Sequence, residues 1–256
     1  MTFLRPIVAA AAVLLACAVS NPVRAEPFSE AQRGEIEAIL KDYMLKHPEI
    51  IREAIDELER RQDAETAEKH KGAIKENAKI LYSSPRQVTL GNPQGDVTFV
   101  EFFDYNCGYC KRAMDDMLTL MKDDPKLKVV LKEFPVLGPG SVEAAQVAAA
   151  VHLQDKSGKK YLEFHQKLLG GRGQADKARA LAVAKDVGLD MARLEKDIAG
   201  PEVKAAIDES MKLAETLGLN GTPSYIVGGQ MVMGAVGLAA LQQKIETARK
   251  CGEAEC

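Results

Sequence analysis

Two cysteines separated by two residues offer the reactive chemistry of this sequence. Cys107 and Cys110 enclose Gly108 and Tyr109, and they follow the apolar run 97–103 where an amphipathic helix is predicted to begin. A thiol at the start of a helix faces unpaired backbone N–H groups and the positive end of the helix dipole, which stabilise the thiolate and lower the thiol pKa. We therefore predict that Cys107 attacks disulfides and that Cys110, one helical turn later, resolves the mixed disulfide.

Three other interpretations of these cysteines compete with this one. A permanent disulfide or half of a zinc site is disfavoured because Cys-x-x-Cys occurs once and the four histidines show no ligand spacing, so we expect no cofactor. Met114, Met117 and Met121 follow at helical spacing, and Met231 and Met233 lie on the late hairpin. With the two thiols, these sulfurs would suit a periplasmic copper-binding protein. The third is a peptide-binding chaperone whose cysteines are secondary.

The elements around the cysteines alternate in a recognisable order. Without the helical block at about 141–218, the order is strand, strand, helix, strand, strand, strand, helix. This order predicts an α/β protein with a thioredoxin fold and an inserted helical subdomain. The predicted strands are 88–90, 97–104, 128–134, 224–227 and 230–233; the predicted helices of the insertion are 142–153, 161–169, 175–187, 191–198 and 203–217; and the last helix is 238–249.

Two motifs together resemble the DsbA family of periplasmic thiol:disulfide oxidoreductases. The run from Glu101 to Cys110, Glu-Phe-Phe-Asp-Tyr-Asn-Cys-Gly-Tyr-Cys, and the later Gly-Thr-Pro at 221–223 are similar to its ScsC-like branch over residues 84–250. The resemblance implies that Pro223 forms a cis peptide bond facing Cys107 and that Thr222 contacts bound substrate. Gly108 and Tyr109 are also predicted to contact substrate. They replace the Pro-His pair of the best-known oxidase, so we expect an intermediate redox potential.

Glu101 is the only charged residue in the strand 97–103. An unpaired carboxylate in a buried strand is costly, so it is expected to be partly protonated or to have a partner, for which Lys132 on the neighbouring strand is suitable. It is similar to the acid that the family places six residues before its nucleophile. We predict that it relays the proton of Cys110; the alternative is a glutamate at the strand end that reaches solvent.

Residues 1–25 resemble a secretory signal, with Arg5 before an apolar run and Val23-Arg24-Ala25 as a cleavage site. A competing interpretation makes Cys17 the lipid-modified residue of a lipoprotein signal. Cleavage would remove Arg5 and Arg24, which leaves 32 basic against 37 acidic residues and a net charge of −5. This charge argues against a nucleic-acid partner. We expect a periplasmic protein that acts on misfolded or disulfide-bearing exported proteins and is reset by a membrane redox partner.

Residues 26–83 are predicted to form a charged helical region with narrow apolar stripes. Its later part, from 59 to 79, is predicted to be a solvated helical or partly disordered linker. The stripes lack an evident site on a thioredoxin core, so we predict that this region assembles a homotrimer or homodimer and that the assembly is an isomerase. A monomer would favour a DsbA-like oxidase. The stripe residues are Ile36, Ile39, Leu40, Tyr43, Ile51, Ile55 and Leu58.

The catalytic domain is predicted to cover residues 84–256, beginning near Ser83-Ser84-Pro85. Cys251 and Cys256 enclose a short loop beyond its last helix. Because an exported protein meets an oxidising compartment, we predict a structural disulfide between them. The alternative is a second redox relay.

Overall fold

The computed structural model describes residues 28–252, which form two units that divide between Leu58 and Glu59. The predicted signal, its cleavage site and Cys17 lie outside the described residues, as does Cys256. The division falls earlier than the boundary predicted near Ser83. The reason is that Ile74 and Leu81 are buried in the core of the second unit.

The first unit is helical and its apolar residues are exposed. Helix α1 (Glu30–Lys46) begins with the predicted capping box, in which Ser29 accepts from the N–H of Gln32 and the Gln32 side chain accepts from the N–H of Ser29. It ends before His47-Pro48, and α2 (Glu49–Glu76) follows. No residue of α1 is buried. All seven predicted stripe residues are exposed, Ile39 by 67%.

The second unit holds a mixed sheet in the order β1-β3-β2-β4-β5. Only β2 and β3 run parallel, which is the thioredoxin arrangement that the element order predicted. Gly228 and Gly229 join β4 and β5 at φ +52° and +74°, a conformation that two-residue hairpins require. The strands are β1 (Val88–Gly91), β2 (Val97–Phe103), β3 (Leu127–Glu133), β4 (Ser224–Val227) and β5 (Gln230–Met233).

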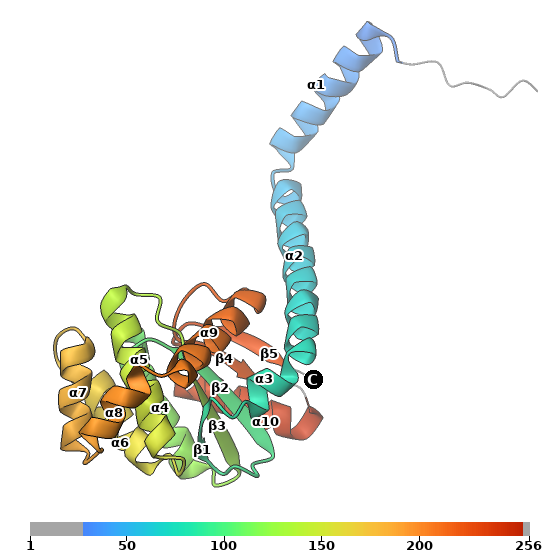
Figure 1. Cartoon of the computed structure of the whole chain (residues 1–256). Helices are drawn as coiled ribbons and strands as arrows, with labels where there is room; N and C mark the ends of the chain where they lie inside the picture. Colours follow the sequence, from blue (N-terminus) through green and yellow to red (C-terminus); the bar gives the residue numbers. More distant parts are fainter. Residues whose placement is uncertain (1–27, 253–256) are drawn as a thin grey trace, which may run out of the picture. The chain divides into compact units, whose positions relative to one another are not determined.

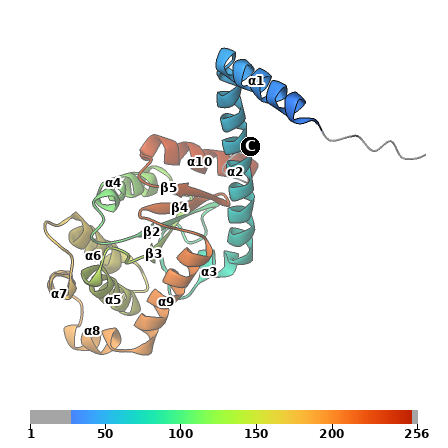
Figure 2. The ribbon, with the colours of Figure 1, turned by 90° about the horizontal axis from the view of Figure 1, so that it is seen from above.

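Helices cover both faces of the sheet (Figures 1 and 2). Successive residues of β2 point to opposite faces, and both sets are therefore buried. Phe99 and Phe103 face α4 (Gly108–Asp123) and α10 (Leu238–Cys251), whereas Val100 and Phe102 face α3 (Ala78–Ser83) and α9 (Pro201–Thr216). The insertion extends the first of these cores. Its other helices are α5 (Pro139–Gln154), α6 (Lys159–Gly170), α7 (Lys177–Asp186) and α8 (Met191–Ile198).

The segment 59–79 is mostly an exposed helix, which is one of the two predicted forms of the linker, but one of its residues is buried. It is helical to Glu76 as part of α2, and Ile74 is 3% exposed against the sheet. The polar composition of the segment did not predict this contact, because Ile74 is the buried residue of α2 and one apolar residue gives no periodic pattern.

Candidate functional site

The two central cysteines lie where β2 ends and α4 begins. Cys107 is the N-cap residue of α4, and its Sγ accepts a hydrogen bond from the backbone N–H of Cys110 at 3.2 Å. The carbonyl oxygen of Thr222 lies 3.2 Å from the same sulfur. Both cysteines are free thiols; Cys107 is 6% exposed and Cys110 is fully buried. The sulfur therefore takes the place that a serine or aspartate oxygen usually holds at a helix start.

The surroundings shift the two thiols in opposite directions. The pKa of Cys107 falls to about 6, first because the Cys110 thiol donates to it, and further because the Thr222 side chain and the N–H groups of Tyr109 and Cys110 bond to it. Burial raises the pKa of Cys110, and the bond to Cys107 raises it further. At neutral pH one sulfur is a thiolate and its neighbour is a thiol, which is the asymmetry that ordered attack requires.

Glu101 lies beneath this pair in the centre of the sheet. It is 3% exposed and pairs with Tyr225 on β4 and Leu131 on β3. Burial raises its pKa to about 8, with further contributions from the charges of Cys107 and Asp116. The alternative of a strand-end glutamate that reaches solvent is therefore wrong.

The suggested partner of Glu101 is also wrong. Lys132 pairs with Phe102 and so faces the opposite side of the sheet, where its Nζ donates to the carbonyl oxygen of Ile80 at 2.7 Å. A one-residue offset along a strand reverses the face, and the sequence pattern gave no register between the two strands.

The Thr222–Pro223 peptide bond is cis, as the resemblance implied. The loop is held at both ends: the Ser224 hydroxyl donates to the carbonyl oxygen of Gly221 at 2.6 Å, and the N–H of Gly234 donates to that of Pro223 at 2.9 Å. These bonds fix the backbone that faces Cys107.

The residues between the cysteines are open to solvent. Tyr109 is 60% exposed, and the guanidinium of Arg112 lies over its ring at 4.4 Å. A Cβ added at Gly108 would meet no atom within 4 Å. The face of the dithiol that these residues form is therefore free to be approached.

Two residues that position the site were not singled out from the sequence, although they stand in the quoted motif. Buried Asp104 accepts four hydrogen bonds, from the N–H groups of Asn106, Val136 and Leu137 and from the Ser141 hydroxyl, at 2.7–2.9 Å. A carboxylate so placed ties the end of β2 to the start of the insertion. The signal that could have identified it is a charged residue at the end of a buried strand.

Asn106 continues this connection one residue before the nucleophile. Its side-chain amide donates to the Ser141 hydroxyl and to the Ala175 carbonyl, each at 2.9 Å, and its oxygen accepts from the N–H of Ala175 at 2.7 Å. The active-site turn is thus bonded to two separate parts of the insertion.

Other predicted features lie away from the dithiol chemistry. Met114 and Met117 are buried in the core and Met121 is partly buried against it, whereas Met231 is partly buried on the other core and Met233 is 41% exposed, and the copper interpretation stays an alternative. Cys251 is disulfide-bonded. Its predicted partner, Cys256, is outside the described residues, and the pairing stays a prediction.

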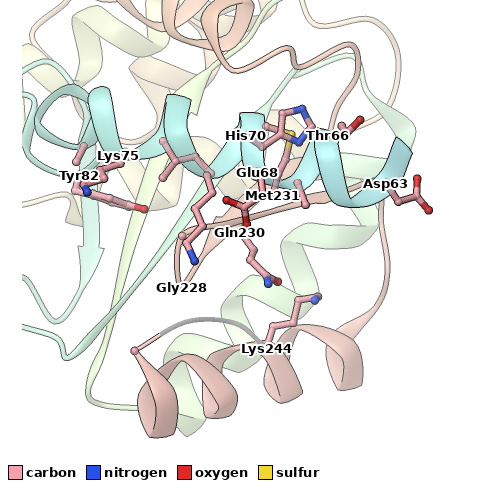
Figure 3. Close-up of a pocket in the computed structure, with 16 residues that line it drawn as sticks. Asp63, Thr66, Glu68, His70, Lys75, Tyr82, Gly228, Gln230, Met231 and Lys244 are labelled. Atoms are coloured by element: carbon pink, nitrogen blue, oxygen red, sulfur yellow. The ribbon is translucent and has the colours of Figure 1, made fainter. Parts of the chain in front are cut away.

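A hollow of about 680 Å³ lies between α2, the β4–β5 hairpin and α10 (Figure 3). Charged and apolar side chains share its lining, among them Glu68, Lys75, Lys244, Tyr82 and Met231. None of the predicted site residues lines it. The dithiol therefore does not lie in this hollow.

The fold and the free dithiol at the start of α4 define a thioredoxin-fold protein with a Cys-x-x-Cys site, and the comparisons with known proteins agree. The family described as DSBA-like thioredoxin domain matches residues 98–246, and the copper resistance protein ScsC N-terminal domain matches residues 32–65. The chain belongs to the DsbA-like thioredoxin family, with a ScsC-type N-terminal domain before its catalytic domain.

Several solved structures are similar to this chain. A thioredoxin-like oxidoreductase from Silicibacter pomeroyi is 45% identical with a TM-score of 0.64, over 68% of this chain and 99% of that one. The thiol-disulfide exchange protein alpha-DsbA2 from Wolbachia pipientis is 31% identical over 69% and 94%, with a TM-score of 0.64. Proteus mirabilis ScsC in a transitional conformation is 26% identical over 87% and 97%, with a TM-score of 0.64.

Curated relatives include longer proteins. The chain is 28% identical over 165 residues to the Na(+)/H(+) antiporter NhaA 1 of Salinispora arenicola, and it spans about a quarter of that protein's length. Among the described residues, no helix combines the length and apolar character needed to cross a bilayer.

The pKa asymmetry predicts how the reduced protein reacts with iodoacetamide. Below about pH 6 Cys107 is protonated and alkylation is slow; the rate rises as the thiolate forms, with its half-maximum near pH 6 instead of the roughly 8.5 of a free thiol. Peptide mass spectrometry is expected to find the label on Cys107. In Cys110→Ala the midpoint should move upward, because the main cause of the lowered pKa is lost. Labelling of Cys110 first would reverse the assignment.

Proposed function

We propose that this chain is an exported, periplasmic oxidoreductase of protein disulfides, with Cys107 as nucleophile and Cys110 as resolving thiol. The observation that supports it most is the Cys107 sulfur at the N-cap of α4, bonded by the N–H of Cys110 at 3.2 Å. Such a sulfur is a thiolate at neutral pH and stays within reach of a second thiol.

The exchange proceeds in two displacements. The Cys107 thiolate attacks a substrate disulfide, forms a mixed disulfide and releases one substrate sulfur as thiolate. Cys110 then loses its proton and attacks the Cys107 sulfur, which forms the Cys107–Cys110 disulfide and releases the second substrate sulfur. Two electrons pass from the dithiol to the substrate, and oxidation of a substrate dithiol is the reverse.

Glu101 is proposed to accept the proton that Cys110 loses. Its carboxylate lies below the dithiol. The charge of Cys107 raises the pKa of Glu101, and the charge of Glu101 raises the pKa of Cys110, so the three groups interact in this buried space. A base with a pKa of about 8 is matched to a proton transfer near neutral pH. Asp116 on α4, whose pKa is also raised by burial, is the next acid toward solvent.

The surface around Cys107 suits protein substrates. Val136 and Leu137 are exposed beside Asp104, Met233 pairs with Ser224 next to Pro223, and Tyr109 adjoins the nucleophile. Exposed apolar side chains gathered at one place are typical of a surface that contacts another protein. They favour unfolded or misfolded exported proteins as substrates, and a membrane redox partner would reset the dithiol.

Assembly through residues 26–75 is proposed to make the protein an isomerase. The match to the ScsC N-terminal domain covers residues 32–65, which contain all seven exposed stripe residues. Helical stripes that bury one another hold several copies together, most simply as a homotrimer or homodimer. Several Cys107 sites around one substrate raise the effective concentration of thiolate at a misplaced disulfide.

Replacing either cysteine should separate the two displacements. We expect Cys107→Ser to abolish all thiol exchange, because no other thiolate starts it, and Cys110→Ser to accumulate mixed disulfides that non-reducing electrophoresis detects. Cys251→Ser serves as the control and should leave insulin reduction unchanged. If the double variant of Cys107 and Cys110 still supported folding of reduced clients at wild-type levels, a chaperone function would replace the proposal.

Glu101→Gln should slow the second displacement and spare the first. The amide keeps the shape of the side chain and cannot take a proton, so the release of substrate from the mixed disulfide is expected to fall on the order of 10²-fold. Stopped-flow measurements separate this step from the alkylation rate of Cys107, which should change little. Equal release rates in the two proteins would remove the role.

The assembly prediction is tested on the full chain by light scattering. Ile39→Glu combined with Tyr43→Glu places charges on the exposed stripe of α1 and should convert the oligomer to a monomer that still reduces insulin but no longer reactivates scrambled ribonuclease. Lys41→Glu changes the net charge equally on the same helix and should remain an oligomeric isomerase. A wild-type protein that is monomeric would contradict the proposal and favour a DsbA-like oxidase.

A further inference from the structure

Four buried polar atoms from four different elements converge on one small cavity. Each lacks a hydrogen-bond partner among the described residues and has almost no contact with solvent. An unpaired buried donor or acceptor has lost its hydrogen bond to water without a replacement, so four at one place point to a polar group that they bind together. The atoms are Gln87 Oε1 before β1, Glu133 Oε2 at the end of β3, His152 Nδ1 in α5 and Ser210 Oγ in α9.

The size of the cavity limits what it can hold. Its volume is about 20 Å³, and a water molecule needs roughly 10–15 Å³ measured in this way. One water fits and an organic ligand does not. Arg86, Ala149, His152 and Ala206 line this cavity and also a wider hollow of about 300 Å³, through which a water can exchange.

The charges around the cavity favour a neutral occupant. Burial raises the pKa of Glu133 well above its ordinary range and lowers that of His152 to about 4, so burial disfavours the charged form of both groups. Lys132 and the ion-paired Arg86 and Glu209 are the charged residues of the lining. The Lys132 cation, which donates to the carbonyl of Ile80, would repel a metal ion.

We propose that this cavity is a binding site for one water molecule that bridges the sheet, at Gln87 and Glu133, to the insertion, at His152 and Ser210. A water donates two hydrogen bonds and accepts two, which equals the number of atoms that surround it. Buried waters typically make about three bonds to such otherwise unsatisfied groups.

The bound water completes a chain of buried contacts that ends near the nucleophile. Glu133 Oε1 accepts from the Tyr161 hydroxyl at 2.7 Å, and the Tyr161 and Tyr105 hydroxyls lie 3.4 Å apart. His165 Nδ1 is 3.3 Å from the Tyr105 hydroxyl. Tyr105 stands two residues before Cys107. The water thereby holds Glu133 in the position from which it supports Tyr161 and the segment that carries the active site.

A crystal structure of the full chain at atomic resolution tests the site directly. We expect density for one water within hydrogen-bonding distance of at least three of the four atoms. A dry cavity, a metal cation in it, or side chains that have turned to bond one another would overturn the proposal.

Water-¹⁷O magnetic relaxation dispersion, which counts long-lived internal waters, gives a second test. Ser210→Val puts apolar atoms into the cavity and should lower the count by one, whereas Ser210→Ala keeps three partners and should leave it unchanged. An unchanged count in the valine variant contradicts the proposal. If that variant does not fold, the wild-type density and the alanine variant still decide.

Discussion

A helix that begins at Cys107 leaves its first N–H groups without carbonyl partners, and the sulfur of Cys107 supplies the missing acceptor. The bond from the Cys110 N–H at 3.2 Å depends on where β2 releases the chain and on the direction in which α4 starts. Both are fixed by Asp104 and Asn106, which bond the turn to the insertion. The ordered turn places the Cys110 thiol and the first N–H groups of α4 at the Cys107 sulfur, and these lower the pKa of that thiol, so that reactivity follows from the fold.

The strand that delivers the cysteines also shows how neighbours decide what a buried acid does. Asp104, at its end, accepts four hydrogen bonds, as a buried carboxylate that serves the structure must. Glu101, three residues earlier, is surrounded by Tyr225, Leu131 and the dithiol, and burial dominates its raised pKa. Two acidic residues three positions apart thus differ in their surroundings: hydrogen bonds hold Asp104, whereas Glu101 is enclosed beside the dithiol.

The sequence predicted the sheet, the insertion and the dithiol because each has a local signal. Apolar runs mark the strands, the Gly-Gly pair marks the hairpin, and Cys-x-x-Cys at a strand end marks the site. What it could not predict depends on contacts between distant residues. The face of Lys132 follows from the register of β2 on β3, and the anchoring of α2 follows from Ile74 alone, which a polar composition conceals. The cis bond at Pro223 has no local signal, and the resemblance to a family supplied it.

The chemistry of one dithiol does not by itself determine whether disulfides are made or rearranged. A lowered pKa of Cys107 stabilises the reduced dithiol, which sets how readily the oxidised protein takes electrons from a substrate. The residues that lower this pKa belong to the second unit. Rearrangement also requires that a released substrate thiol meets another attack before it diffuses away. That depends on how many active sites surround the substrate, which the exposed apolar residues of the first unit would control. If the first unit assembles as proposed, the two properties reside in separate units, and changes in the helical region would convert an oxidase into an isomerase while the active site stays the same.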